Sequence, residues 1–546
     1  MIKQKPDWIK AKGYLHLTPS LSTDKEWKKY YAQITNEKFI EQYAFFPLLH
    51  SNIIERKYKK FNPDKHLNTN KTGRSHRHKI GLNNTKQTAK KRPLHYASHY
   101  DALIYSYYGH LLNDRYNTIL KQDSELNKSV IAYRKITVGT TGRGKSTIHF
   151  AKEAFDEIAR RSEEETVAAL TFDIESFFSG LDHKILYQKW CEVVGNNQLP
   201  KHHYKVYRAC TNFSYVLRDD LRIKQTKGKR RAGFDEKKLH QIRRTKGYNC
   251  FFYDVKDFRS TIKEGNLRIY KNPFCKKLEN GKSVKIGIPQ GLPLSAVLAN
   301  LYLLDFDRSI IKKVCNQFNG YYRRYSDDLL VVCNIDNVEE IKQYIVSEIK
   351  KYQLEISLQK TEEFTFRKLI YNKKNDERLT SIKVENGEEK IAKPLVYLGF
   401  EYRGYNTSIK ATNIAKYYRR LIQIVKRRAK RASSYYNNNP YGKKAIFKNQ
   451  IKKLYNAPLK VIDHDGQEQK QKYRTRYNLV ENSYGEYDLV LRCLPVKRQS
   501  NYITYLNRCD KIFENTKENS FKKNIRKRHN ILNHAIRKHL DRNIKE

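Results

Sequence analysis

Tyr325-Ser326-Asp327-Asp328 sets two adjacent carboxylates between segments of extended character. Tyr321–Arg324 precedes this stretch and the apolar run Leu329–Cys333 follows it, a pattern that predicts a β-hairpin with both aspartates at its turn. Two negative charges pressed together at a solvent-reachable turn are costly unless a cation neutralises them. Carboxylate oxygens of this kind suit Mg²⁺, which takes its remaining ligands from water and substrate phosphates. The stretch therefore predicts a magnesium site, although an Asp-Asp pair on its own is more often a solvated turn.

A third carboxylate is expected from the segment Val167–Phe178, whose pattern predicts a buried strand that ends at Asp173. Asp182-His183 then predicts the start of a helix over Lys184–Val194. Asp173 would supply the carboxylate that bridges two Mg²⁺ ions about 4 Å apart, which activate a primer 3′-hydroxyl and stabilise the departing pyrophosphate. Two-metal nucleotidyl transfer is the chemistry that three such aspartates favour.

Two further segments have residues that suit contacts around such a site. Ile288–Ser295 is a turn rich in Pro and Gly that leads into an amphipathic helical pattern through Leu298 and Phe306, so it offers backbone N–H groups and an amide side chain to a nucleotide. Leu395–Phe400 predicts an apolar strand that is broken by Gly399, where another backbone can pass closely.

The chain resembles a reverse transcriptase in the order of five motifs, namely FDIESFF (172–178), IPQGLPLSAVLANLYL (288–303), YSDD (325–328), LQKT (358–361) and YLGF (397–400). The resemblance covers roughly residues 167 to 404. It implies that Asp173, Asp327 and Asp328 form the catalytic and metal-binding triad, with Ile174 as a further metal-binding position. It also implies residues that bind the dNTP and grip the primer. The dNTP-binding positions are Phe178, Gln290, Gly291 and Lys360, with Lys91 and Arg92 from a shorter basic match at residues 91–94, and the primer grip is Leu398 and Gly399.

Phe178 is expected to select the sugar of the incoming nucleotide. It lies five residues after Asp173, and in the reverse transcriptases that the chain resembles a bulky aromatic at this position blocks a 2′-hydroxyl. An aromatic ring excludes the hydroxyl sterically and offers it no hydrogen bond, so strong discrimination against ribose follows. Strand alternation would send Phe177 and Phe178 to opposite faces, one into the core and one toward the site. The alternative is that both are core aromatics.

The charge of the chain predicts a polyanionic partner. Lys and Arg number 109 against 57 Asp and Glu, which gives a formal charge of +52. No apolar run approaches 18 residues and no signal-like segment begins the sequence, so neither a membrane partner nor export is expected. The 41 tyrosines lie among basic residues and suit stacking on bases, although an AT-rich coding genome would account for part of their number. The eight cysteines show no paired spacing, which favours reduced thiols in a cytoplasmic protein.

The expected fold is α+β, a right-hand polymerase with an antiparallel palm sheet and a helical, basic C-terminal region. Its parts are fingers with the N-terminal region (1–165), a palm (166–410) and a thumb with the C-terminal region (411–546). A basic insertion is expected near 215–280, where Lys224–Arg244 predicts a loop that either faces nucleic acid or is simply solvated. Asn413–Ala432 combines an apolar stripe with a cationic face and predicts a thumb helix that tracks a duplex, and Phe521–Lys538 predicts one helix or two.

A competing motif, Gly139–Ser146, satisfies the P-loop pattern of nucleotide triphosphatases. An apparent strand over Val130–Val138 precedes it and a helical pattern over Thr147–Arg160 follows it. A P-loop fold needs several further βα units, whereas polymerase motifs follow here. A basic glycine loop that touches template or triphosphate, or a plain turn, is therefore favoured.

Phrases such as Leu304–Asp307 and Tyr322–Tyr325 most resemble the bacterial abortive-infection and defence-associated reverse transcriptases, with group II intron and retron enzymes as alternatives. The resemblance implies cDNA synthesis in anti-phage defence with two Mg²⁺ ions, Mn²⁺ being the alternative. The expected partners are dNTPs, a DNA product, an RNA template that could be a dedicated non-coding RNA, and a second polymerase or another copy of the chain. A catalytically idle nucleic-acid scaffold is disfavoured because all three carboxylates are present. Candidates for priming on a protein hydroxyl are Tyr484, Tyr487, Tyr502 and Tyr505.

Overall fold

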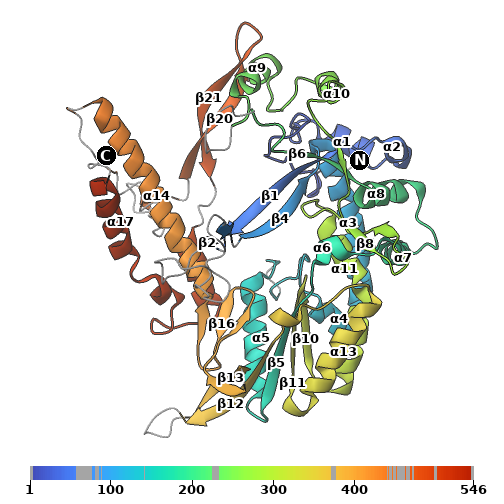
Figure 1. Ribbon diagram of the computed structural model, residues 1–546, viewed down its shortest axis with the longest axis vertical. Helices are drawn as coiled ribbons and strands as arrows, with labels where there is room; N and C mark the ends of the chain where they lie inside the picture. Colours follow the sequence, from blue (N-terminus) through green and yellow to red (C-terminus); the bar gives the residue numbers. More distant parts are fainter. Residues whose placement is uncertain are drawn as a thin grey trace.

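The computed structural model shows a right-hand arrangement in which a palm lies below the fingers and a long C-terminal helix stands to one side (Figure 1). The residues that the structure describes are 4–56, 77–79, 85–87, 89–139, 142–223, 233–370, 377–385, 387–439, 441, 446, 451, 461–462, 468–469, 472–496 and 501–542. None of the described helices is both long enough and apolar enough to cross a lipid bilayer.

The palm is built on a six-stranded antiparallel sheet in the order β10-β11-β5-β12-β13-β14. Along β5, Leu170 and Phe172 enter one core, whereas Val167 and Ala169 enter a second core on the opposite face. Because both faces are covered, the central strands are continuous apolar runs without polar alternation. The strands are β5 (Val167–Asp173), β10 (Tyr321–Tyr325), β11 (Asp328–Asn334), β12 (Glu362–Ile370), β13 (Glu377–Glu385) and β14 (Glu388–Ile391).

Helices cover the first face of the palm sheet. The single amphipathic helix expected through Leu298 and Phe306 is instead two helices, because Leu303 leaves helical geometry with φ −96°. The pattern was also wrong about exposure, since most side chains of the first helix are buried. The helices associated with this core are α3 (His99–Lys121), α4 (Ser124–Ser129), α6 (Phe177–Gly180), α7 (His183–Val194), α8 (Lys201–Thr211), α11 (Ser295–Tyr302), α12 (Leu304–Ile310), the π-helical η1 (Ile311–Gln317) and α13 (Val338–Lys351), which follows η2 (Ile335–Asn337).

The second face is covered by α5 (Thr147–Arg161), by α16 (Tyr502–Ile512) and by a small antiparallel sheet of β15 (Leu395–Tyr397), β16 (Phe400–Tyr402) and β17 (Thr407–Ile409). The helix predicted after Gly139–Ser146 is therefore confirmed as α5. The strand predicted before it is wrong, because residues 130–138 form only isolated bridges, Val130 with Arg324 and Thr137 with Gly144. Lys145 forms an ion pair with Glu153 at 2.5 Å. The disfavoured P-loop alternative thus lacks the strand that it requires.

The fingers carry a four-stranded sheet in the order β4-β1-β6-β7, in which β1 and β6 run parallel. Part of the predicted loop Lys224–Arg244 is a helix, α9 (Glu236–Lys246), because Asp235 caps its first turn and Leu239 and Ile242 are buried. Residues 224–232 of that prediction lie outside the described residues. The remaining elements before α11 are α1 (Trp27–Ile34), α2 (Glu37–Gln42), β1 (Leu48–Arg56), β2 (Arg77–Lys79), β3 (Thr85–Gln87), β4 (Ala89–Tyr96), β6 (Ser214–Leu217), α10 (Val255–Lys263), β7 (Tyr270–Lys271), β8 (Cys275–Lys277) and β9 (Ser283–Lys285).

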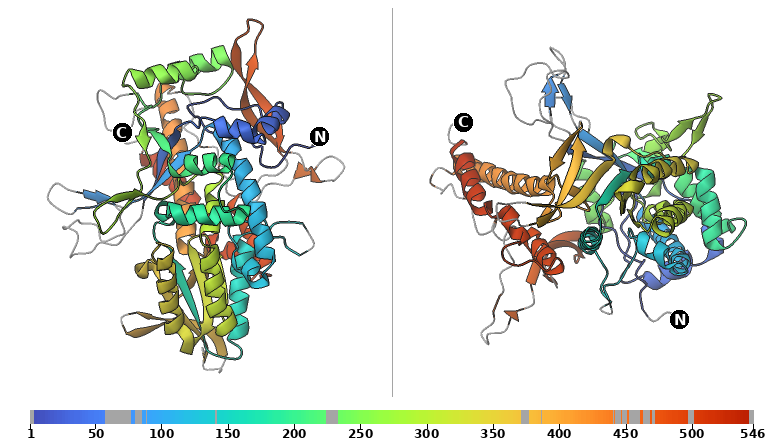
Figure 2. Two further views of the ribbon diagram at one scale, coloured as in Figure 1. Left: turned by 90° about the vertical axis from the view of Figure 1, so that its right-hand side faces the viewer. Right: turned by 90° about the horizontal axis from the view of Figure 1, so that it is seen from below.

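The C-terminal region begins with the 28-residue helix α14 (Ala411–Asn438), which confirms the helix predicted over Asn413–Ala432. It lies alongside α17 (Arg528–Arg542), and Leu421, Val425 and Leu532 share one apolar core between them (Figures 1 and 2). The predicted C-terminal helix pair is η4 (Phe521–Ile525) followed by α17. A hairpin of β20 (Lys472–Glu481) and β21 (Tyr487–Val496) extends across to α9 (Figure 1), and a short pair β18 (Val461–Ile462) and β19 (Glu468–Gln469) precedes it.

Candidate active site

The predicted hairpin is confirmed, with β10 and β11 joined by a tight turn at Ser326 and Asp327. Ser326 adopts the left-handed conformation with φ +63°, which turns the chain sharply before Asp328. Asp328 lies directly opposite Asp173 on β5, and the Ile174 N–H donates to the Asp327 carbonyl at 3.0 Å. Directly opposed residues on adjacent strands have Cβ atoms about 5 Å apart. The fold therefore brings the three predicted carboxylates to one end of the two central palm strands.

The electrostatics of this end of the sheet disfavour the charged forms of Asp327 and Asp328. Burial, together with the charges of Asp327 and Asp173, raises the pKa of Asp328 to about 6, and Lys410 and Lys360 oppose this shift. Burial and Asp173 also raise the pKa of Asp327, while Lys90 opposes this shift. Three lysines from separate parts of the chain therefore act on the aspartates.

The residues present fit a divalent cation by their donor chemistry. Adjacent carboxylates whose charged forms are destabilised are the ligands that a hard cation stabilises. Among the described residues, no three His, Cys, Asp or Glu side chains are grouped so that they could hold a metal ion as they stand, and the Lys360 ammonium is ion-paired with Asp173. Ile174 lies beside the triad, but its side chain is buried, so its carbonyl oxygen is the atom that could ligate.

Gln290 and Gly291 lie where the palm meets the fingers. The His95 N–H of β4 donates to the Gln290 carbonyl at 2.9 Å, and the Ile288 N–H donates to the Phe178 carbonyl at 2.8 Å. Gly291 has φ +119°, and a Cβ at this position would lie 2.8 Å from the His95 carbonyl oxygen. Only glycine fits this close approach to His95. Through these contacts the turn connects β4 to Phe178, in the segment that follows Asp173.

Phe178 does not follow the predicted strand alternation. Ser176 takes a left-handed conformation with φ +49° and ends the extended segment, so Phe177 and Phe178 begin the helical turn α6. Phe177 is buried, whereas Phe178 is only half-buried. The expected division into one core ring and one more accessible ring therefore arises from a helical turn.

The predicted basic match, Lys91 and Arg92, lies on β4 beside a third cation, Lys90. Lys90 is the β4 cation whose charge acts on Asp327. Lys91 is exposed on the opposite face of the strand. Arg92 forms a 3.8 Å ion pair with Glu55 of β1, and Glu55 also pairs with Lys416 of α14 at 2.6 Å. These contacts link the fingers to the C-terminal helix.

The predicted primer grip is a hairpin turn and not an interrupted strand. Leu398 and Gly399 join β15 to β16 with φ values of +44° and +93°. The Lys410 N–H donates to the Gly399 carbonyl at 3.0 Å. Because the charge of Lys410 acts on Asp328, this turn lies on the same side of the palm as the aspartates.

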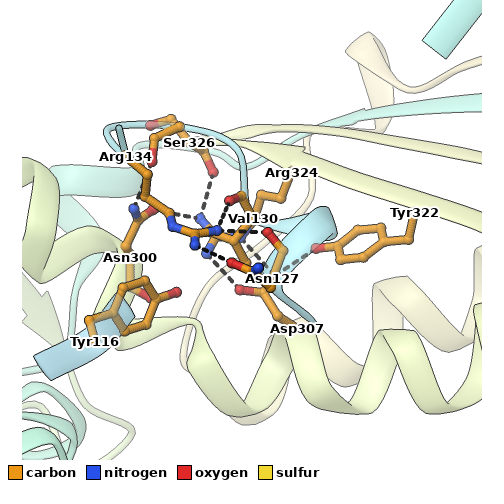
Figure 3. A network of polar contacts seen from close by, with 10 residues as sticks. Tyr116, Asn127, Val130, Arg134, Asn300, Asp307, Tyr322, Arg324 and Ser326 are labelled. Atoms are coloured by element: carbon orange, nitrogen blue, oxygen red, sulfur yellow. Dashed lines mark hydrogen bonds and ion pairs between the residues drawn. The ribbon is translucent and has the colours of Figure 1, made fainter. Parts of the chain in front are cut away.

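A buried polar network beneath the aspartate turn escaped the sequence analysis (Figure 3). Arg324 and Asp307 are both fully buried and form a two-pronged ion pair, with Nε–Oδ1 and Nη2–Oδ2 distances of 2.7 and 2.6 Å. Burial works against the charge on Arg324, but Asp307 more than offsets it and holds the pKa of the guanidinium above its usual value. The Tyr322 hydroxyl donates to Asp307 at 2.8 Å and completes the coordination of the carboxylate.

The same guanidinium reaches the aspartate turn. Arg324 Nη1 donates to the Ser326 carbonyl at 3.3 Å and to Asn300 Oδ1 at 3.2 Å. Tyr133, which has φ +60°, donates its hydroxyl to Ser326 Oγ at 3.3 Å. A nearby Arg134 donates to the carbonyls of Asn127 and Val130 and so holds the segment that carries Tyr133 (Figure 3). The sequence signal that could have revealed this network is Arg324, the second of two adjacent arginines in β10. Strand alternation places its side chain on the buried face of the strand.

The four candidate priming tyrosines differ in accessibility. Tyr484 is 87% exposed at the tip of the β20–β21 hairpin. A hydrogen bond to Glu481 raises the pKa of Tyr487. Burial raises the pKa of Tyr502, to about 12, and of Tyr505, so both hydroxyls hold their protons tightly.

Comparison with known proteins identifies the domain. Residues 229–402 match the family described as "Reverse transcriptase (RNA-dependent DNA polymerase)", a span that includes the aspartate hairpin but begins after Asp173. No curated protein sequence matches the chain. The chain therefore contains a region that matches a reverse transcriptase domain, within an α+β fold.

Two solved telomerase structures are similar to the chain at low identity. One is apo telomerase from Candida tropicalis truncated from its C-terminal domain, with 11% identity, 60% of this chain and 53% of that chain covered, and a TM-score of 0.36. The other is telomerase from Candida albicans with a fragment of telomeric RNA, with 12% identity, 60% and 44% covered, and a TM-score of 0.33. The chain thus spans about half the length of these structures.

Proposed function

We propose that the protein is an RNA-directed DNA polymerase that uses Asp173, Asp327 and Asp328 as its catalytic triad. The observation that supports this proposal best is the pairing of Asp328 with Asp173 on adjacent strands, beside Asp327, in a chain with a reverse transcriptase domain. Three carboxylates at one end of a sheet, with the charged forms of Asp327 and Asp328 destabilised, favour a site that works with divalent cations.

The aspartates would hold two Mg²⁺ ions, which supply the activation of a 3′-hydroxyl and the neutralisation of a departing pyrophosphate. Lys360, whose ammonium pairs with Asp173, would contact the triphosphate if metal ions took its place beside that carboxylate. Lys90 of β4 approaches from the fingers and adds positive charge on the same side. The half-buried Phe178 limits the space for a ribose 2′-hydroxyl.

The partners follow from the charge and the domain. A formal charge of +52 favours a nucleic-acid duplex, and the reverse transcriptase domain favours an RNA template with a DNA product. We further propose, from the resemblance of its motifs, that the enzyme makes cDNA in bacterial anti-phage defence. The domain limits at 165 and 410, and the primer-grip role of Leu398 and Gly399, belong to the same proposal.

Replacing both turn aspartates tests the catalytic role. Asp327→Asn with Asp328→Asn should keep the fold, because removing clustered negative charge relieves repulsion, and should lower Mg²⁺-dependent dNTP incorporation at least 1,000-fold. Radiolabelled primer extension on an RNA template measures the loss, and circular dichroism checks the fold.

The matched control is Asp336→Asn, an exposed carboxylate just beyond β11. Its incorporation should equal that of the unaltered protein. Incorporation by the double variant at the rate of this control would refute the polymerase assignment.

A further inference from the structure

Helix α8 is flanked by two cavities on the outer side of the molecule, away from α14 (Figure 1). The first, of about 700 Å³, lies between α8 and the segment 41–45, which includes the last turn of α2. The second, of about 720 Å³, lies between α8, α7 and residues 198–199. Lys201 and Tyr204 line both cavities, so they form one continuous surface across α8.

Three tyrosines form a fixed aromatic platform on this surface. The rings of Tyr204 and Tyr207 stack with centroids 6.1 Å apart at 23°, and Tyr187 packs edge-on against Tyr207 at 5.4 Å. The Tyr207 hydroxyl donates to the His183 carbonyl at 2.7 Å, and the Tyr187 hydroxyl accepts from the Leu199 N–H at 3.3 Å. Tyr204 is 42% exposed. A rigid, accessible ring of this kind can stack on a base.

Four cations surround the platform, Lys184 on α7 and Lys201, Lys205 and Arg208 on α8. Within the part of the chain that the structure describes, none of the four forms an ion pair. Lys189, also on α7, is by contrast paired with both Glu192 and Asp305. Glu41 is the one acidic residue among those lining the two cavities. The positive charge around Tyr204 is therefore available to a polyanion.

We propose that this surface, the α8 platform, is a second nucleic-acid site that binds a single strand outside the polymerase cleft. Bases stack on Tyr204 while the phosphates contact Lys201, Lys205 and Arg208 on one side and Lys184 on the other. A single strand fits this chemistry because its bases are free to stack, whereas a duplex hides them. The unpaired part of an RNA template and a displaced DNA strand share these groups.

The test is a binding titration that needs no catalysis. Fluorescence anisotropy follows a labelled 12-nucleotide single strand, as RNA in one arm and DNA in the other, while a saturating unlabelled blunt RNA–DNA duplex occupies the cleft. Tyr204→Ala should weaken binding about 5- to 50-fold because one stacked base is lost. Tyr204→Phe should bind normally, because it keeps the ring. Lys201→Glu with Lys205→Glu should weaken binding and reduce the salt dependence by about one to two phosphate contacts.

Lys312→Glu with Lys350→Glu is the charge-matched control, because both residues are exposed elsewhere on the palm. All variants should extend a primer on a template with a one-nucleotide overhang at the normal rate, which shows that each one folds. Weaker binding of both RNA and DNA supports a site that contacts base and phosphate. Weaker binding of RNA alone supports a site that also contacts the 2′-hydroxyl. Normal affinity of Tyr204→Ala for both strands, or equal losses for the two lysine double variants, would overturn the proposal.

Discussion

At Arg324 the palm buries a charge where its neighbours bury apolar side chains. Removing one partner of a buried ion pair commonly costs about 3–5 kcal/mol because the other charge is left without compensation. The guanidinium also donates to the carbonyl of Ser326, which begins the turn before Asp327. The pair therefore has two separable effects, one on stability and one on the position of the aspartates.

Arg324→Lys is expected to keep a charge opposite Asp307 but lose the contact with Ser326. We predict that kcat falls about tenfold and that more Mg²⁺ is needed for half-maximal activity, while KM for dNTP changes little. Steady-state primer extension across a Mg²⁺ titration measures all three quantities.

Arg324→Met with Asp307→Leu separates the two effects. Because no buried charge is left without a partner, the midpoint of thermal unfolding should equal that of the unaltered protein. The higher Mg²⁺ requirement predicted for Arg324→Lys should remain, because the contact with Ser326 is still missing. An Mg²⁺ dependence in Arg324→Lys identical to that of the unaltered protein would show that the pair has no positioning role.

Phe178 should govern the choice of sugar. Phe178→Ala is expected to admit rNTPs, lowering the ratio of dNTP to rNTP incorporation more than tenfold, while some dNTP incorporation remains, since the ring only blocks space. Competition assays with matched dNTP and rNTP measure this ratio. Phe177→Leu, a change in the neighbouring buried ring, should leave it unaltered. Equal use of the two sugars by the unaltered protein would remove both the gate and the DNA-polymerase assignment.

At the scale of elements, the β20–β21 hairpin meets the insertion helix α9. Arg244 pairs with Glu486 at 2.6 Å, and the Tyr487 ring lies so close to Gly247 that a Cβ there would be 2.8 Å from it. Together with the Lys416–Glu55 pair, this contact connects the C-terminal region to the fingers at a second point. We expect these contacts to slow the release of a bound duplex.

Glu486→Arg should therefore shorten the product made in one binding event about two- to fivefold, a modest effect because exposed ion pairs contribute about 1 kcal/mol or less. Arg244→Glu combined with Glu486→Arg should recover the product length, because the pair is reformed with opposite polarity. Primer extension in the presence of a heparin trap reads the length distribution. Product lengths that do not differ among the three proteins would contradict a role for this contact.

Elements with strong local signals were predictable from the sequence. Asp182 caps α7 as expected, the apolar runs around Asp327 form the hairpin, and the stripe on α14 packs as a helix. The helix α9 was missed because charged residues obscure its two buried positions, Leu239 and Ile242. The turn at Leu398 was missed because an apolar run does not show where a chain reverses.

The candidate site was predictable only in part, for a related reason. The aspartates are marked by their motifs, and the structure brings Asp173 and Asp328 together. Lys90 and Lys410 approach the aspartates through strand register and chain reversal, which depend on long-range pairing. The Arg324–Asp307 pair joins two segments 17 residues apart and carries no motif of its own.

At the scale of the whole molecule, positive charge is distributed among parts with different tasks. Lys90, Lys360 and Lys410 act on the aspartates, α14 presents a cationic face, and the α8 platform lies on the outer side. The overall positive charge of the chain thus supports several separate contacts with nucleic acid, and the strength of each contact depends on ionic strength.

Sequencing the product of the purified protein tests the central claim most directly. The reaction contains Mg²⁺, four dNTPs and an RNA template of defined sequence with an annealed primer, and an Asp173→Asn protein runs beside it. The account predicts DNA that extends the primer with the complement of the template, and no extension by Asp173→Asn or after chelation of the metal. Product unrelated to the template, or equal product from the Asp173→Asn protein, would contradict it.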